Sequence, residues 1–232
     1  MGSLGLLLRG EPASMRAWVE RWEPRQLAIC LAVILAGAGL YGAAMGAWRA
    51  PLQALFVALK FPAILLLTTL GNALLNGMLA PLLGVPISFR QSLLAILVSF
   101  TVAAAILGSF SPLAAFMVWN APPIAAEARL SSGPYSFILL THVTVIAFAG
   151  ITANVRLWQL LRQLSGSSAG ARRVLLGWLA GNLLLGSQLA WILRPFIGSP
   201  TLPVEFVRTT AFQGNFYEAV YRSLLRVLSA TS

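Results

Sequence analysis

The sequence predicts an all-α membrane protein: a polytopic transmembrane helix bundle of about five spans, with amphipathic helices at the interfaces. The chain has 232 residues, of which 58% are hydrophobic and 9% charged. A soluble domain has roughly 45–50% apolar and about 25% charged residues. In addition, five segments reach the roughly 20 apolar residues that a helix needs to cross a bilayer. These observations exclude an ordinary soluble domain and a disordered chain.

An amphipathic segment, residues 1–26, precedes the first span. Met15, Trp18 and Trp22 fall on one face of a short predicted helix, which Pro24 ends. Tryptophan suits the headgroup region because one end of the indole is apolar and the other polar. We expect this segment to lie on the cytoplasmic surface of the membrane.

The transmembrane bundle is assigned to residues 27–195, and its predicted spans are residues 27–48, 62–84, 92–110, 135–155 and 174–193. The apolar stretch 52–84 would be about 50 Å long as one helix, which is more than a single crossing needs. Proline suits the first turn of a helix and not its interior. Pro62 therefore predicts the start of the second span, with Leu52 to Lys60 as a separate interfacial helix. One kinked helix is the alternative.

Two connections between spans are long. Residues 111–134 contain four prolines together with apolar side chains such as Trp119, and we expect this loop to dip into the interface or cover the end of the bundle. Residues 156–173 combine four arginines with a Ser/Gly-rich run, which predicts a flexible basic loop. Residues 196–232 form a predicted extramembrane tail that ends in an amphipathic helix. Asn215, with Glu218 three residues later, is a capping-box-like start for that helix.

The net charge is +10, and the chain has no Asp. The arginines stand in ones and twos beside apolar runs, which favours contact with anionic lipid headgroups over nucleic acid. Arginines are more numerous on the side of the N-terminus, so the charge rule predicts the N-terminus inside and the C-terminus outside. The bacterial cytoplasmic (inner) membrane is the expected location.

His142 is the only histidine and lies in the outer half of the fourth span. A neutral imidazole can bind the metal of a haem or another tetrapyrrole. It can also hydrogen-bond a hydroxyl or carbonyl group of a neighbouring helix. Asn72 and Asn76, one turn apart in the second span, have two readings as well: hydrogen bonds between helices, or a polar cavity for a substrate or lipid headgroup.

Small residues recur at four-residue spacing in two spans. In the first span Ala38, Gly42 and Gly46 have this spacing, with Gly39 beside them, and in the fifth Gly177 and Gly181 have it. Small residues at this spacing let two helix backbones approach closely. The pattern predicts either oligomerisation through these faces or packing inside one bundle.

The segment after the fifth span is rich in residues that anchor and turn the chain. Trp191 and Arg194 suit the headgroup region, and Phe196 stands between two prolines at 195 and 200. We expect this segment, together with Trp119 in the long loop, to dock on a partner protein.

Motifs of enzymes are missing from the sequence. No Asp or Glu lies in a predicted span, and the chain has no HExxH, Gly-x-Ser-x-Gly or P-loop pattern. Cys30 is the only cysteine, so we expect a packed core thiol and no disulfide within the chain. We predict a protein that is not an enzyme, with no metal site and no required cofactor.

The five spans of residues 27–195, with opposite ends of the chain on opposite sides, resemble the Yip family of Ypt/Rab-interacting membrane proteins and uncharacterised bacterial multi-pass relatives. The resemblance rests on layout and composition, and it implies a non-enzymatic membrane adaptor. The long tail departs from the layout of that family.

We therefore expect an integral membrane subunit or scaffold of a larger assembly, with the lipid bilayer and other membrane subunits or further copies of this chain as partners. The alternatives are a binding module for a lipid or tetrapyrrole through His142, and a small substrate carrier.

Overall fold

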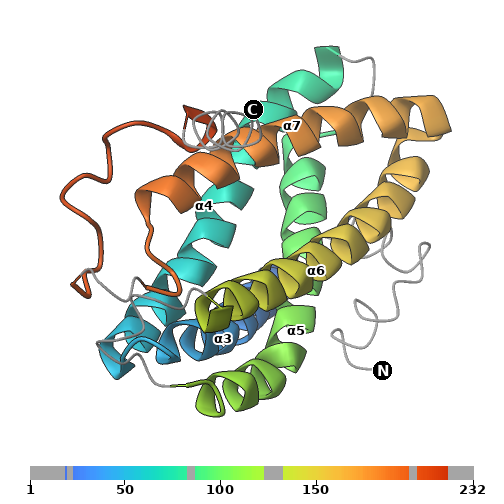
Figure 1. Ribbon diagram of the computed structural model, residues 1–232. Coiled ribbons are helices and arrows are strands. Elements are labelled where there is room, and N and C mark those ends of the chain that lie inside the picture. The colour runs from blue at the N-terminus through green and yellow to red at the C-terminus, as the bar shows by residue number, and fades with distance from the viewer. Residues whose placement is uncertain (1–18, 20–22, 83–86, 123–132, 199–202, 219–232) are drawn as a thin grey trace, which may run out of the picture.

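The computed structural model describes residues 19, 23–82, 87–122, 133–198 and 203–218, and these ranges contain no strand. Five long helices form the bundle in Figure 1: α3 (Pro24–Ala47), α4 (Pro51–Leu82), α5 (Phe89–Trp119), α6 (Gly133–Ser165) and α7 (Ser168–Ile192). Each of the five is long and apolar enough to cross a membrane. The predicted all-α class and the five spans are confirmed.

Local sequence explains where three of the helices begin. Pro24 opens α3 at a position where its missing N–H does no harm, and Glu23 and Gln26 form a capping box. The Ser88 hydroxyl accepts a hydrogen bond from the Gln91 amide at 3.3 Å before α5. The Ser167 hydroxyl accepts one from the Gly170 amide at 3.0 Å before α7. These oxygens satisfy amides that have no partner inside the helix.

Three predictions about the helix boundaries were wrong. Residues 52–60 are not a separate interfacial helix, because α4 runs unbroken through Pro62. The loop predicted at 111–134 is helical up to Trp119, with Pro112 inside α5. The basic loop predicted at 156–173 shrinks to a turn at residues 166–167 between α6 and α7. Helices in membranes tolerate proline because neighbouring helices hold the backbone on both sides of it.

The two predicted amphipathic ends lie largely outside the described residues. Of the helix proposed for residues 15–22, only Val19 is described, and it is buried in the core. At the other end, Asn215 caps a helical start as predicted, since its side-chain oxygen accepts a hydrogen bond from the Glu218 amide at 2.9 Å.

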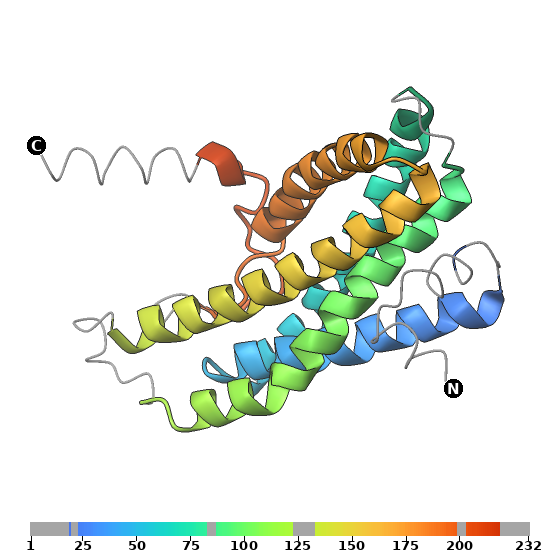
Figure 2. The same cartoon turned by 90° about the vertical axis from the view of Figure 1, so that its right-hand side faces the viewer.

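Helix α5 is the central element, packing against α3, α4 and α6, while α7 packs on α4 and α6 from outside. In the apolar stretch of α5, 61% of the residues are buried, whereas in the apolar stretch of α7 only 6% are. Figures 1 and 2 both show α6 and α7 diverging from their short turn.

We call residues 193–198 and 203–218 the C-terminal segment. It packs beside the first half of α4, where the Gln53 side chain donates hydrogen bonds to the carbonyls of Pro195 and Phe196, both at 2.9 Å. The Lys60 ammonium donates to the Pro195 carbonyl at 3.3 Å. These donors fasten the C-terminal segment to the bundle.

Alternation of the spans brings specific helix ends together. The end of α3, the starts of α4 and α6, the end of α7 and the first residues of the C-terminal segment lie at one end of the bundle, and the start of α3 lies at the other (Figure 2). The candidate site is built here from pieces that are far apart in the sequence.

Candidate functional site

A cavity of about 520 Å³ lies at this end of the bundle, between α3, α4, α6 and the C-terminal segment. Its walls are almost entirely apolar, and its polar side chains are those of His142, Arg194 and Arg208. The full lining is Met45, Phe61, Ile64, Leu139, His142, Val143, Ile146, Ala190, Arg194, Pro195, Phe196, Ile197, Gly198 and Arg208. Pockets that hold small ligands typically measure about 300–1,000 Å³ and have this composition.

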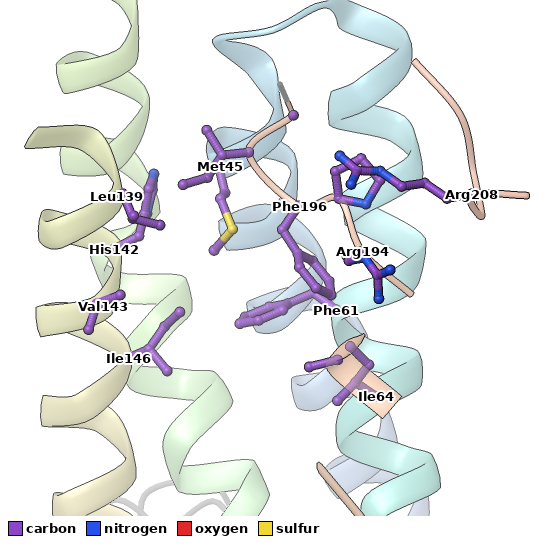
Figure 3. A pocket seen from close by; sticks show the side chains of 14 residues that line it. Met45, Phe61, Ile64, Leu139, His142, Val143, Ile146, Arg194, Phe196 and Arg208 are labelled. Carbon is purple, nitrogen blue, oxygen red and sulfur yellow. The ribbon is translucent and has the colours of Figure 1, made fainter. Parts of the chain in front are cut away.

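Figure 3 shows the arrangement of the walls. Helix α6 contributes one wall, with His142, Val143 and Ile146 along it. Phe61 and Phe196 lie across the cavity, with ring centroids 6.4 Å apart. Arg194 and Arg208 lie beyond these rings, on the side away from α6.

His142 is buried, with 2% of its surface exposed, and it pairs with a residue of another helix. The Tyr41 hydroxyl of α3 lies 2.8 Å from His142 Nδ1, and the two rings meet edge to face. This is the predicted bond to a hydroxyl of a neighbouring helix. The other nitrogen, Nε2, is buried and has no hydrogen-bond partner among the described residues. A buried polar atom left unpaired is unfavourable, so a ligand atom that pairs with Nε2 would remove this cost.

The two arginines differ in how they are held. Arg194 lies over the Trp191 ring, with 3.5 Å between the guanidinium carbon and the ring centroid, and donates to the Trp191 carbonyl at 2.8 Å. The guanidinium of Arg208 has no hydrogen bond or ring contact to a described residue. Burial and the neighbouring charge of Arg208 lower the pKa of Arg194. The two positive charges therefore repel each other at the cavity.

Lys60, the only lysine in the chain, is fully buried beneath the C-terminal segment. Its ammonium reaches the carbonyls of Pro195 and Glu205 and the face of the Phe206 ring, 5.1 Å from the centroid. From the sequence, Lys60 was expected at the end of an interfacial helix. A lone lysine inside an otherwise apolar stretch was the signal that could have marked it.

The predicted site residues fall into two groups. His142, Arg194 and Phe196 line the cavity together, although the sequence suggested ligand binding for His142 and partner docking for Arg194 and Phe196. Trp191 lies beneath Arg194, whereas Trp119 is 88% exposed at the end of α5, away from the cavity. Tyr41, Lys60 and Arg208 were missed, because nothing in the sequence links them to His142 or Arg194.

The asparagine pair lies elsewhere, between α4 and α7. The Asn72 side chain donates to the Asn182 side-chain oxygen of α7. Asn76 is fully buried, and neither of its side-chain atoms has a partner among the described residues. Neither residue lines the cavity. For Asn72, the structure therefore supports the first of the two predicted roles, a hydrogen bond between helices.

The glycines of α3 lie against α4 of the same chain. A Cβ atom on Gly42 would lie 2.6 Å from the Val57 carbonyl oxygen, and one on Gly46 would lie 2.6 Å from that of Gln53. A Cβ atom on Gly39 would lie 3.4 Å from the Ala58 carbonyl oxygen, and one on Gly181 of α7 would clash with the Asn72 side chain. Gly177 is half-buried. Gly42, Gly46 and Gly181 therefore pack against helices of the same chain, which is the second of the two predicted roles.

A second, more open groove of about 670 Å³ lies between α6 and α7 and is lined by apolar residues and Asn154. It contains neither a charged side chain nor His142. Gly150 and Ile151 border it, and they serve as controls in the experiments below.

Comparison with family models, with curated proteins and with solved structures finds no match. The resemblance to the Yip family stays a prediction, and the function has to be argued from the cavity.

Proposed function

We propose that this protein is a membrane-embedded binding protein for an amphipathic ligand, whose apolar part occupies the cavity between α3, α4, α6 and the C-terminal segment. The observation that carries the proposal is the cavity itself: about 520 Å³, apolar walls, and three basic side chains. In a bilayer, such a cavity offers a chain-bearing molecule contacts that lipid tails alone do not provide. No reaction is part of the proposal.

The test is native mass spectrometry of the protein extracted from its own membrane in mild detergent, together with an absorption spectrum. We expect the chain to carry a bound small mass that survives mild activation. Ile146→Trp, which fills the cavity, should abolish that mass. Ile151→Trp, on the same helix but in the second groove, should leave it unchanged. If the wild-type chain carries no added mass, the proposal fails.

The absorption spectrum separates two kinds of ligand. A colourless bound mass supports a lipid-like molecule. Visible absorbance that disappears in His142→Ala would identify a tetrapyrrole held by the imidazole, and it would overturn the lipid reading.

A second candidate function, a subunit or scaffold of a larger membrane assembly, is favoured by one property of α7. Its mean hydropathy, 1.3, is the lowest of the five spans. Even so, only 6% of the residues in its apolar stretch are buried inside the bundle. A helix that faces only lipid is expected to be more apolar, and small and polar residues favour contacts between helices. Masses that are multiples of 24.8 kDa, or that contain other proteins, would support this function. A monomer in its native membrane would contradict it.

A further inference from the structure

Positive charge collects at one side of the cavity without an acidic side chain to balance it. Arg194 and Arg208 both line the cavity, and none of the lining residues is Asp or Glu. Lys60 lies just behind, bonded to the carbonyl of Pro195, which is itself a lining residue. Like charges held this close are unfavourable unless an anion lies between them.

The arginine pair is prepared to receive such an anion. Stacking on Trp191 and the bond to its carbonyl fix the orientation of Arg194. Arg208 keeps its donors uncommitted within the part of the chain that the structure describes. Its backbone is held in place, because its carbonyl accepts a hydrogen bond from the Ala211 amide at 2.9 Å.

His142 supplies a third group, on the opposite wall. Among the described residues, the Tyr41 hydroxyl has no hydrogen-bond partner other than His142 Nδ1, at 2.8 Å. If the phenol donates its proton there, the neutral imidazole carries its own proton on Nε2. Nε2–H is then a buried donor without an acceptor, and an ester or hydroxyl oxygen of a ligand would satisfy it.

Arg194 and His142 belong to different levels of the predicted spans. Arg194 follows the end of α7 almost directly, at the level where a span meets the headgroup region. His142 lies about 14 Å along α6 from its first residue, inside the apolar part of the membrane. The cavity therefore runs from a basic end to an apolar interior.

We propose that the ligand is a phospholipid-like molecule whose phosphate headgroup is bound by Arg194 and Arg208, with its apolar chain extending along α6 past His142. This inference rests on the proposed function and adds the chemistry of the headgroup. A phosphate carries three strong acceptor oxygens and up to about two negative charges, whereas a carboxylate carries two oxygens and one charge. Two neighbouring guanidinium groups therefore suit a phosphate better.

The experiment compares two ligands that differ only in the headgroup. Delipidated full-length protein is titrated with dioleoyl phosphatidic acid and with dioleoylglycerol, and binding is measured by native mass spectrometry. We expect phosphatidic acid to bind at least about tenfold more tightly. Arg208→Gln should weaken its binding about 10- to 100-fold and leave dioleoylglycerol binding unchanged. Arg208→Lys, which keeps the charge but loses the fork, should fall in between.

Arg173→Gln is the matched control, because Arg173 is an exposed arginine at the opposite end of α7. It should bind phosphatidic acid as the wild type does. Equal binding of the two lipids, or equal loss in the two Arg→Gln variants, would overturn the headgroup assignment while leaving the apolar cavity intact. Binding of neither lipid would overturn the proposed function as well.

Two further probes separate the sources of the anion. Oleate that binds as tightly as phosphatidic acid would replace the phosphate with a carboxylate and so contradict the inference. Inorganic phosphate that binds as tightly as the lipid, with the same dependence on Arg208, would show a free-anion site and also contradict it.

Discussion

His142 illustrates how one buried side chain can serve the packing and the cavity together. Its Nδ1 pairs with the Tyr41 hydroxyl across the contact between α3 and α6, and its Nε2 has no partner among the described residues. The hydrogen bond to Tyr41 fixes the orientation of the imidazole ring. His142 also lines the cavity, and its unpaired Nε2 is the atom that a ligand could bind. The sequence identified His142 as notable, but not Tyr41, which lies 101 positions earlier in the chain.

We predict that Tyr41→Phe destabilises the protein by about 1–3 kcal/mol, because it leaves Nδ1 buried without a partner. Thermal unfolding in one detergent measures the effect. Thr141→Val is the control, since that hydroxyl bonds only the Phe137 carbonyl of its own helix. The double variant Tyr41→Phe/His142→Phe should be less destabilised than the sum of its single variants. Additive effects would show that the two residues are not coupled.

Glycine at the contact of α3 and α4 leads to a second residue-level prediction. Gly42→Ala places a methyl group against the Val57 carbonyl, so the two helices must separate, at a cost of about 1–3 kcal/mol. Gly150→Ala, with no atom within 4 Å of its Cβ position, should be neutral or stabilising by up to about 1 kcal/mol. Thermal unfolding compares the two variants. A Gly42→Ala protein as stable as Gly150→Ala would contradict the close contact.

At the scale of elements, the C-terminal segment depends on two donors of α4. We predict that Gln53→Leu/Lys60→Met loosens residues 195–198, because the Pro195 and Phe196 carbonyls lose their donors. Hydrogen exchange should rise in the C-terminal segment and stay unchanged in α5. Leu59→Met, an exposed neighbour on α4, is the control. Unchanged exchange in the double variant would show that ring contacts such as Phe56–Phe206 hold the segment without these donors.

The elements also show which parts of the fold hydropathy can and cannot predict. Apolar runs located all five spans, because the bilayer demands about 20 apolar residues wherever a helix crosses. They did not locate the helix ends. Both α4 and α5 continue through proline, and α6 extends to Ser165 through arginines that hydropathy excludes. A helix can continue into the headgroup region, where polar residues are tolerated.

The cavity was less predictable than the spans for a related reason. Its apolar lining looks like any span, and its walls come from distant parts of the chain. The Gln53–Pro195 hydrogen bond, for example, joins residues 142 positions apart. Arg208 lies in an irregular stretch with no periodicity to interpret. Only the three-dimensional arrangement shows that Arg194, Phe196 and His142, which the sequence did indicate, belong together.

At the scale of the whole molecule, five spans place the turn between α6 and α7 on the opposite side of the membrane from the C-terminal segment. We predict that cysteines introduced at Ser167 and at Thr210, both exposed, react with an impermeant maleimide from opposite sides of sealed vesicles. Cys30, which is buried, is replaced by serine in both variants. The arginines near the turn predict that Ser167 faces the cytoplasm.

Each outcome of the labelling has a distinct meaning. Labelling of both positions from one side would contradict the five crossings. Labelling from opposite sides, but with Thr210 in the cytoplasm, would keep the crossings and reverse the predicted orientation.

The position of the cavity walls along the chain has a consequence for biosynthesis. Arg194, Phe196 and Arg208 follow the last span, while Met45 and Phe61 belong to the first two. A nascent chain can therefore insert all five helices before the walls of the cavity are complete. The site forms only after the ribosome has added the residues beyond α7 and these have reached the side of the membrane where α4 begins. Under the proposed function, ligand capture therefore has to wait for the residues up to Arg208. A chain stopped at Leu193 is then expected to insert into the membrane but to bind no ligand.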